Sequence, residues 1–275
     1  MLSHKILHNE FDPPEELQDV IKCFWYEKRN PEKEQLSLEV LPDSYAEIIF
    51  YFGSELSISY NGDFQILSSP FIMGLLNQPF TIKADKGLEI IGIRCFPWAV
   101  FDLLGLPSGK AGLQIFDHPI GKLQMVLNEL IEASKIDEAI DVVKECFLNL
   151  KSQISSDSML YKAGLAMRES GGTLPVSQVA NAAHATIRTL ERNFKQSSGY
   201  TVKDVSGLMR FEQVRNQLLL NTDLNISALA HELGYTDQSH LSREFKRYSG
   251  TTPAAFARKT KKEISNIDFV AFIQS

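Results

Sequence analysis

The chain has 275 residues, a formal net charge of −6 and 44% hydrophobic residues. This composition is typical of a soluble globular protein and excludes a disordered or collagen-like chain. No run of about 18 uncharged apolar residues occurs, and the N-terminus lacks the apolar segment of a secretion signal. The three cysteines are an odd number without metal-ligand spacing, which argues against a disulfide framework or a structural zinc. We therefore expect a cytoplasmic bacterial protein without a membrane partner.

The length predicts two domains, and the charge is divided unequally between them. Residues 1–158 carry a net charge of −11, whereas residues 159–275 carry +5. The acidic balance of the whole chain argues against a nucleic-acid partner, but the basic C-terminal part favours one.

The first elements are short and mostly of strand type. Apolar residues at helical spacing after Pro13-Pro14-Glu15-Glu16 predict a helix over Leu17–Trp25. Strands are predicted at 36–41, 46–52, 56–60, 64–67, 80–84 and 88–96. Asn61-Gly62 predicts a tight hairpin, because a type I′ turn needs positive φ at both central residues. Many short strands at close spacing indicate a small barrel or sandwich, cupin-like or related.

Helical periodicity begins near Lys122 and continues to Lys151, with a break near Ser134. The polar segment 153–158 is the predicted linker. Beyond it, helices are predicted at 159–168, 176–183, 187–196, 202–220, 226–233, 238–248 and 253–259. The expected fold class is thus an α+β two-domain chain, with a β-rich domain at 1–152, an all-α domain at 159–259 and a tail at 260–275.

The all-α part contains an internal sequence repeat of two copies. Ala180 recurs as Ala230 at an offset of 50 residues. At an offset of 51, Leu190, Arg192, Phe194, Lys195 and Gly199 recur as Leu241, Arg243, Phe245, Lys246 and Gly250. Each copy has a small Ala where two helices cross, a tight turn, and an N-cap residue, Thr186 or Asp237. This pattern is typical of a helix-turn-helix unit.

The outward face of each second helix carries groups that suit DNA. Arg matches the acceptors of guanine, Gln matches adenine, and the N-terminal end of such a helix enters the major groove. The candidate DNA-binding residues are Thr186, Arg188, Glu191, Arg192 and Lys195 in the first copy, and Gln238, Ser239, His240, Ser242, Arg243 and Lys246 in the second. Arg192 and Arg243 fit base contacts, phosphate contacts or ion pairs with Glu191 and Glu244. Lys195 and Lys246 fit phosphates better than bases.

These residues resemble the C-terminal DNA-binding domain of the AraC/XylS family of bacterial transcriptional regulators. The second copy carries the resemblance most clearly, in the run from Gly234 to Arg247 followed by Gly250-Thr251-Thr252-Pro253. The first copy departs from the family pattern, with His184 and Ala185 in place of Gly and an apolar residue, and with Val202 where Pro is common. The resemblance covers about residues 159–259 and implies two units joined by the helix at 202–220. It also implies a transcriptional activator that binds double-stranded DNA, with RNA polymerase and a second copy of the chain as further partners. The resemblance implies pairing of two copies through the helices at 123–131 and 136–150, but these helices could instead form a lid packed on the sheet of their own chain.

The acidic part contains no recognisable catalytic motif. No His occurs between Glu10 and Asp117, so a metal-binding cupin is not expected, and we predict no cofactor, no metal and no enzymatic activity. Three segments, Trp25-Tyr26, 41–50 and 96–101, are rich in aromatic residues, and the polar residues Asp43, Tyr45, Glu47 and Arg94 lie in or near them in the sequence. They either line a pocket for an unidentified small-molecule effector or form an ordinary core.

Two alternatives to an effector-controlled regulator remain open. One is a small-molecule-binding protein or cupin-like enzyme that uses the helical domain as a scaffold. The other is a regulator without an effector, whose N-terminal domain only dimerises.

Overall fold

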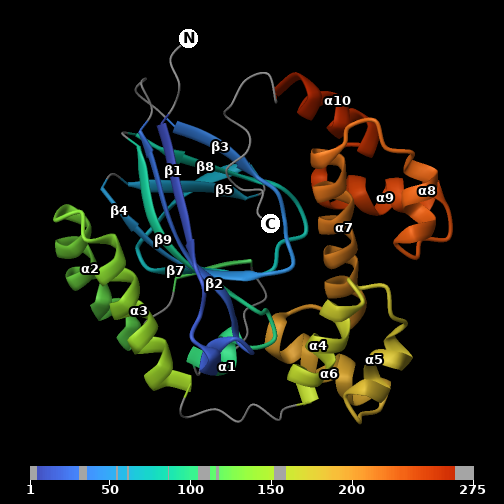
Figure 1. The fold of residues 1–275 in the computed structure, drawn as a ribbon, viewed down its shortest axis with the longest axis horizontal. Helices are drawn as coiled ribbons and strands as arrows, with labels where there is room; N and C mark the ends of the chain where they lie inside the picture. Colours follow the sequence, from blue (N-terminus) through green and yellow to red (C-terminus); the bar gives the residue numbers. More distant parts are fainter. Residues whose placement is uncertain are drawn as a thin grey trace.

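The computed structural model describes residues 5–30, 36–53, 55–60, 62–85, 87–104, 112–115, 118–151 and 159–263. A β-rich part is followed by an all-helical part, and the two lie side by side (Figure 1). The predicted fold class is therefore confirmed. The predicted linker at 153–158, and the tail beyond residue 263, lie outside the described residues.

Two antiparallel sheets build the β-rich part. The larger sheet consists, in spatial order, of β1 (Lys5–Phe11), β2 (Ile21–Asn30), β9 (Leu88–Cys95), β4 (Ala46–Phe52), β7 (Phe71–Met73) and β10 (Leu113–Ile115). The smaller consists of β3 (Leu36–Val40), β8 (Phe80–Ala84), β5 (Leu56–Tyr60) and β6 (Asp63–Leu67). Side chains from both sheets form one buried cluster, so the sheets face each other across a shared core.

Most predicted strands are confirmed, including the hairpin of β5 and β6, in which Tyr60 lies opposite Asp63. Gly62 in its turn has φ +104°, and Asn61 lies outside the described residues. The short strands β1, β7 and β10 were not predicted. β1 is a polar edge strand, and β7 and β10 are too short to show a periodic pattern.

The prediction of a helix at Leu17–Trp25 is wrong. The chain forms a 3₁₀ helix at Glu15–Leu17 and then strand β2, which pairs with β1 on one side and β9 on the other. Both faces of β2 are buried: Phe24 packs into the cluster shared with the helices, whereas Trp25 packs between the sheets. A strand buried on both faces has a near-continuous apolar run, which mimics helical spacing over a few residues.

Three helices belong to the β-rich part: α1 (Val100–Leu104), α2 (Leu123–Glu132) and α3 (Ile136–Lys151). The last two form the predicted helical pair and cover the outer face of the larger sheet (Figure 1). The ring of Phe147 in α3 meets that of Phe24 edge-on, with their centroids 6.1 Å apart.

The helical part contains α4 (Met159–Glu169), α5 (Val176–Ala182), α6 (Ile187–Ser198), α7 (Val202–Leu220), α8 (Ile226–Glu232), α9 (Gln238–Ser249) and α10 (Pro253–Glu263). All seven were predicted, although α10 continues four residues past the predicted boundary at 259. The long helix α7 starts with a capping box, in which Thr201 and Asp204 each bond the other's backbone N–H. Among the described residues, no helix is both long and apolar enough to cross a membrane.

An aromatic wedge joins the two parts. Trp98, which follows β9, is buried; its ring is stacked on Phe96 at 5.4 Å and lies 6.1 Å from the Phe194 ring of α6. Helix α4 approaches this indole through Gly164, where a Cβ atom would lie only 2.1 Å from the ring. One hydrophobic cluster therefore runs from the larger sheet into the first helix-turn-helix unit.

We expect Gly164→Ala to lower the free energy of unfolding by about 1–3 kcal/mol, because the added methyl group overpacks against Trp98. Helix propensity alone would favour Ala there, so a loss of stability must come from the collision. Gly121→Ala is the control, since the nearest atom to its Cβ would be 3.8 Å away. Denaturant unfolding of the full chain measures both, and an unchanged or raised stability for Gly164→Ala would show that the indole is not wedged.

Candidate nucleic-acid interface and ligand pocket

The two helix-turn-helix units are α5–α6 and α8–α9. Leu190 and Phe194 of α6, like Leu241 and Phe245 of α9, are fully or almost fully buried and hold each second helix on its unit. The turn of the second unit passes through Gly234 at φ +72°, and His184 takes the equivalent place in the first unit at φ +52°. The departure from the family pattern at His184 therefore leaves the turn geometry intact but places a side chain in the left-handed region.

Each second helix begins with a side-chain cap. Thr186 accepts a hydrogen bond from the backbone N–H of Thr189 at 3.2 Å, and Asp237 accepts one from that of His240 at 2.7 Å. The bond from His240 is the main cause that lowers the pKa of Asp237, which therefore stays ionised at the helix N-terminus. The caps occupy the backbone donors that an uncapped helix end would leave free.

Most predicted contact residues lie on exposed faces of α6 and α9. Thr186, Arg188, Arg192 and Lys195 are exposed in the first unit, and Gln238, Ser239, Arg243 and Lys246 in the second. Glu191, His240 and Ser242 are half-buried. His240 packs edge-on against the Tyr235 ring with centroids 5.3 Å apart. The structure thus gathers the predicted residues on two equivalent surfaces, one per unit.

Both acidic neighbours of the outward arginines are engaged elsewhere. Glu191 accepts a hydrogen bond from the backbone N–H of Val202 at 3.1 Å, which ties α6 to the start of α7. Glu244 accepts from Arg210 and Tyr235. The alternative in which these carboxylates neutralise Arg192 and Arg243 therefore has no support in the geometry.

We expect His184→Gly to raise the free energy of unfolding by about 0.5–1 kcal/mol, because a left-handed backbone strains every residue except Gly. Gly234→Ala should have the opposite effect, lowering it by about 1 kcal/mol. Both values come from denaturant unfolding. A destabilised His184→Gly protein would mean that the imidazole makes a contact that outweighs the strain.

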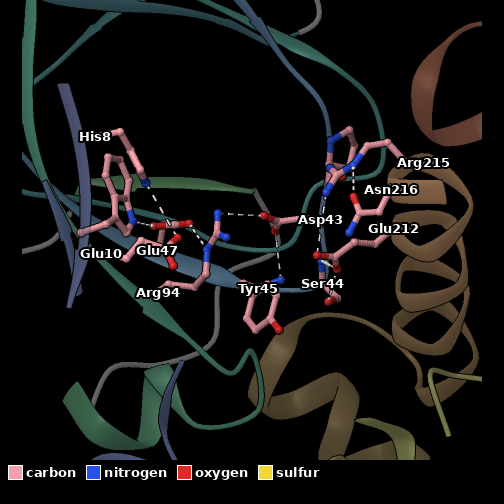
Figure 2. A network of polar contacts seen from close by, with 12 residues as sticks. His8, Glu10, Asp43, Ser44, Tyr45, Glu47, Arg94, Glu212, Arg215 and Asn216 are labelled. Atoms are coloured by element: carbon pink, nitrogen blue, oxygen red, sulfur yellow. Dashed lines mark hydrogen bonds and ion pairs between the residues drawn. The ribbon is translucent and has the colours of Figure 1, made fainter. Parts of the chain in front are cut away.

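A buried polar cluster lies inside the β-rich part (Figure 2). The Glu47 carboxylate accepts hydrogen bonds from Trp25 Nε1 and Arg94 Nε, both at 2.7 Å. Arg94 also donates to Asp43 at 3.2 Å and lies over the Tyr45 ring. Burial raises the pKa of Glu47 despite the nearby guanidinium. The structure therefore brings together the four polar residues and Trp25, all of which the sequence singled out, although Trp25 lies on strand β2 and not on the predicted helix.

This cluster borders a narrow, mostly apolar cavity of about 40 Å³, room for little more than one water molecule. Its lining combines polar groups at one end with apolar side chains from both sheets: Trp25, Leu41, Pro42, Asp43, Tyr45, Glu47, Ile49, Ile58, Phe71, Phe80, Ile82, Ile90 and Arg94, among others. In this conformation the residues fit both sequence-based interpretations, since most of them are core and a few line a cavity.

The 41–45 segment, between β3 and β4, has two faces. On one side Leu41, Pro42, Asp43 and Tyr45 line the cavity. On the other, Ser44 Oγ donates to Glu212 of α7 at 2.6 Å, and Arg215 of α7 donates to the carbonyl of Pro42 at 3.3 Å (Figure 2). A polar cleft of about 510 Å³ opens beside these contacts, between the two parts of the chain. The lining of the cavity is thus bonded directly to α7, the helix that joins both helix-turn-helix units.

We expect Glu212→Gln to stabilise the protein increasingly as the pH rises. Burial, followed by the charge of Asp43, raises the pKa of Glu212, so the folded protein binds this proton more tightly than the unfolded chain. The stability that the group contributes is present below its ordinary pKa of 4.5 and is lost as the pH rises through the raised value.

Melting temperatures at about pH 5 and about pH 8 measure this difference, with the exposed Glu232→Gln as control. The gain from Glu212→Gln should be small at the lower pH and larger at the higher. A difference that does not depend on pH would contradict the assignment.

Comparison with known proteins bears on both parts. Residues 179–259 match the family described as a helix-turn-helix domain, and residues 9–114 match a domain of unknown function. The Msm operon regulatory protein of Streptococcus mutans is 26% identical over 151 residues, covering 54% of this chain and 48% of that protein. The transcriptional activator RhaS of Pectobacterium carotovorum is 26% identical over 167 residues, covering 54% and 60%.

The transcriptional regulator RipA of Corynebacterium diphtheriae is 32% identical over 82 residues, covering 30% of this chain and 24% of that protein. This chain thus spans about a quarter to three-fifths of the length of these relatives. The solved structure of ToxT from Vibrio cholerae aligns with 86% of this chain and 97% of its own at 14% identity, with a TM-score of 0.47. The relatives in sequence are each named as regulators of transcription.

The duplicated motif, the two units built on α7 and the matching regulators agree. The predicted resemblance to the AraC/XylS family is confirmed for the C-terminal helix-turn-helix domain.

Proposed function

We propose that the chain is a sequence-specific DNA-binding regulator of transcription, an activator and not an enzyme. The observation that carries the proposal is the pair of equivalent exposed helices, α6 and α9, that a single buried helix, α7, holds in one chain. Such a pair suits two successive major grooves on one side of B-DNA, which are about 34 Å apart, so one chain would cover roughly 20 base pairs.

Contacts with phosphates and contacts with bases have different roles in this proposal. Phosphate contacts by Lys195 and Lys246, together with the positive charge of the C-terminal part, supply affinity that does not depend on sequence. Arg188, Arg192, Gln238 and Arg243 supply discrimination between bases. The remaining predicted contacts lie at the same helix ends or faces: Thr186, Glu191, Ser239, His240 and Ser242. Glu191 would reach a base only by releasing its bond to Val202.

In this proposal residues 159–259 form the DNA-binding domain, and the N-terminal domain, residues 1–152, senses a small molecule or mediates dimerisation. Because its cavity is narrow, an effector must displace side chains of the lining, including those of the 41–45 segment. That displacement would strain or break the bonds of this segment to Glu212 and Arg215. A ligand that binds the two arrangements unequally shifts the balance between them, which is what allosteric control requires.

A second copy of the chain and RNA polymerase complete the set of proposed partners. Exposed apolar side chains on α2, Met125 and Val126, are compatible with pairing through the α2–α3 helices. A regulator of this kind acts where the chromosome lies, so a cytoplasmic location is part of the proposal.

We expect Arg243→Ala to weaken binding to the preferred sequence by about 1–3 kcal/mol and to relax one base position. The preferred sequence is obtained by selecting a randomised duplex pool with the full chain, and affinities are then measured by fluorescence anisotropy. Lys246→Ala is the matched control on the same helix. It should weaken binding to all sequences alike and lower the salt dependence by about one phosphate contact.

The selection itself tests the proposed function. A motif with two elements about ten base pairs apart supports it, particularly if an Arg192→Ala, Arg243→Ala double variant no longer selects that motif. An unchanged preference in Arg243→Ala would refute the role of this residue as a base reader. No binding at low salt would overturn the proposal in favour of a small-molecule-binding protein with a helical scaffold.

A further inference from the structure

Arg210, in the middle of α7, contacts the turn that leads into the first helix-turn-helix unit and, at the same time, helix α9 of the second unit. One terminal nitrogen donates to the backbone carbonyl of Gly172 at 2.8 Å, in the turn between α4 and α5. The other donates to both carboxylate oxygens of Glu244 in α9, each at 3.0 Å. A single planar guanidinium group therefore connects the turn that leads into the first unit, the joining helix and the second unit.

Neighbouring groups complete this contact. Tyr235, in the turn of the second unit, donates to Glu244 at 2.8 Å, and its ring lies beneath the guanidinium with 5.2 Å between Arg210 Cζ and the ring centroid. On the next turn of α7, Gln213 donates to the carbonyl of Gly171 at 2.6 Å. We call Arg210, Gln213, Glu244, Tyr235 and the Gly171-Gly172 turn the inter-unit bracket.

The two glycines permit the close approach that the bracket needs. Both have positive φ, +59° for Gly171 and +76° for Gly172. A Cβ atom on Gly172 would lie 2.4 Å from the carbonyl oxygen of Ser206 in α7, and one on Gly171 would lie 2.0 Å from the Gln213 amide. The turn therefore presses its backbone against α7, which places its carbonyl groups within reach of Arg210 and Gln213.

The contacts of Arg210 restrict the relative orientation of the elements that it joins as well as their separation. The guanidinium donates through Nη1 to Gly172 and through Nη2 to Glu244, so contacts with two different partners restrict its orientation as well as its position. Arg210 and Glu244 each keep only 15% of their side-chain surface exposed, so water screens this pair less than a surface pair. Asn193 is the residue of the first unit that corresponds to Glu244, so only the second unit has a carboxylate at this position.

We propose that Arg210 is a positioning residue that sets the separation and relative rotation of α6 and α9, and thereby the spacing between the two DNA elements that the chain accepts. The inference rests on the proposed function, which it deepens. Because one added base pair rotates the second element by about 36° around the DNA axis, a rigid pair of units should tolerate few spacings, whereas a loosened pair should tolerate several.

The first test compares affinities for duplexes in which the two selected elements are moved apart or together by one or two base pairs. The full chain should lose about tenfold in affinity for each altered spacing. Arg210→Gln should lose less than about threefold across the same series, yet bind a duplex with the second element alone as well as the unaltered protein does. Lys203→Gln, the same charge change at an exposed position of α7, should retain the strict spacing.

A second test needs no DNA and is independent of the proposed function. Spin labels on Gln196→Cys and Lys246→Cys, both exposed, report the distance between the units in a Cys146→Ser background, since Cys23 and Cys95 are buried. Arg210→Gln should broaden the distribution of this distance, and Lys203→Gln should not.

The outcomes separate the two ideas. An unaltered spacing preference and an unaltered distance distribution in Arg210→Gln would overturn the inference. So would loss of binding to the second element alone, because Arg210 would then be needed to fold that unit and not to orient it. If the unaltered chain selects no DNA element, the proposed function fails and the spin-label distances alone decide whether Arg210 orients the units.

Discussion

The arrangement of the whole C-terminal part depends on the burial of α7. Val205, Leu208, Phe211 and Val214 are completely buried along this helix, and the Phe211 ring packs against Phe245 and Tyr248 of the second unit at 5.0 and 5.3 Å. Each two-helix unit is too small to bury a core by itself, so each completes its core on α7. The same burial forces the two exposed helices into a defined relation, because the polar groups that remain on α7 can be satisfied only by specific partners in both units.

The contacts between the two parts of the chain differ in physical kind. The wedge of Trp98 between Phe96, Gly164 and Phe194 is apolar, and neither protonation nor salt changes it much. The bonds of the 41–45 segment to Glu212 and Arg215 involve buried charged groups, whose energies depend on how well each is paired. The apolar contacts of Trp98 would keep the two parts together while the polar bonds of the 41–45 segment change. The N-terminal part could therefore influence α7 without dissociating from it.

The sequence predicted the helical part far better than the start of the β-rich part. Helices α6 and α9 are strongly amphipathic, begin at the caps Thr186 and Asp237 and end at Gly199 and Gly250, so periodicity and caps identified them. Strand β2 was taken for a helix because both of its faces are buried, which removes the alternation that identifies a strand. That error placed Trp25 on a helix, although it lies on the strand that brings it to the polar cluster with Asp43, Tyr45, Glu47 and Arg94.

By itself, the sequence determined the duplicated motif, the family resemblance of the C-terminal part and most of the residues that α6 and α9 expose, because these follow from local spacing and from side-chain chemistry. Only the tertiary structure determined which contacts these and other residues make. It gave Glu191 and Glu244 partners outside their own helices, turned the 41–45 segment toward both a cavity and α7, and joined the units through Arg210. These contacts link residues that lie far apart in the chain, and no periodic pattern in one sequence records which distant groups will meet.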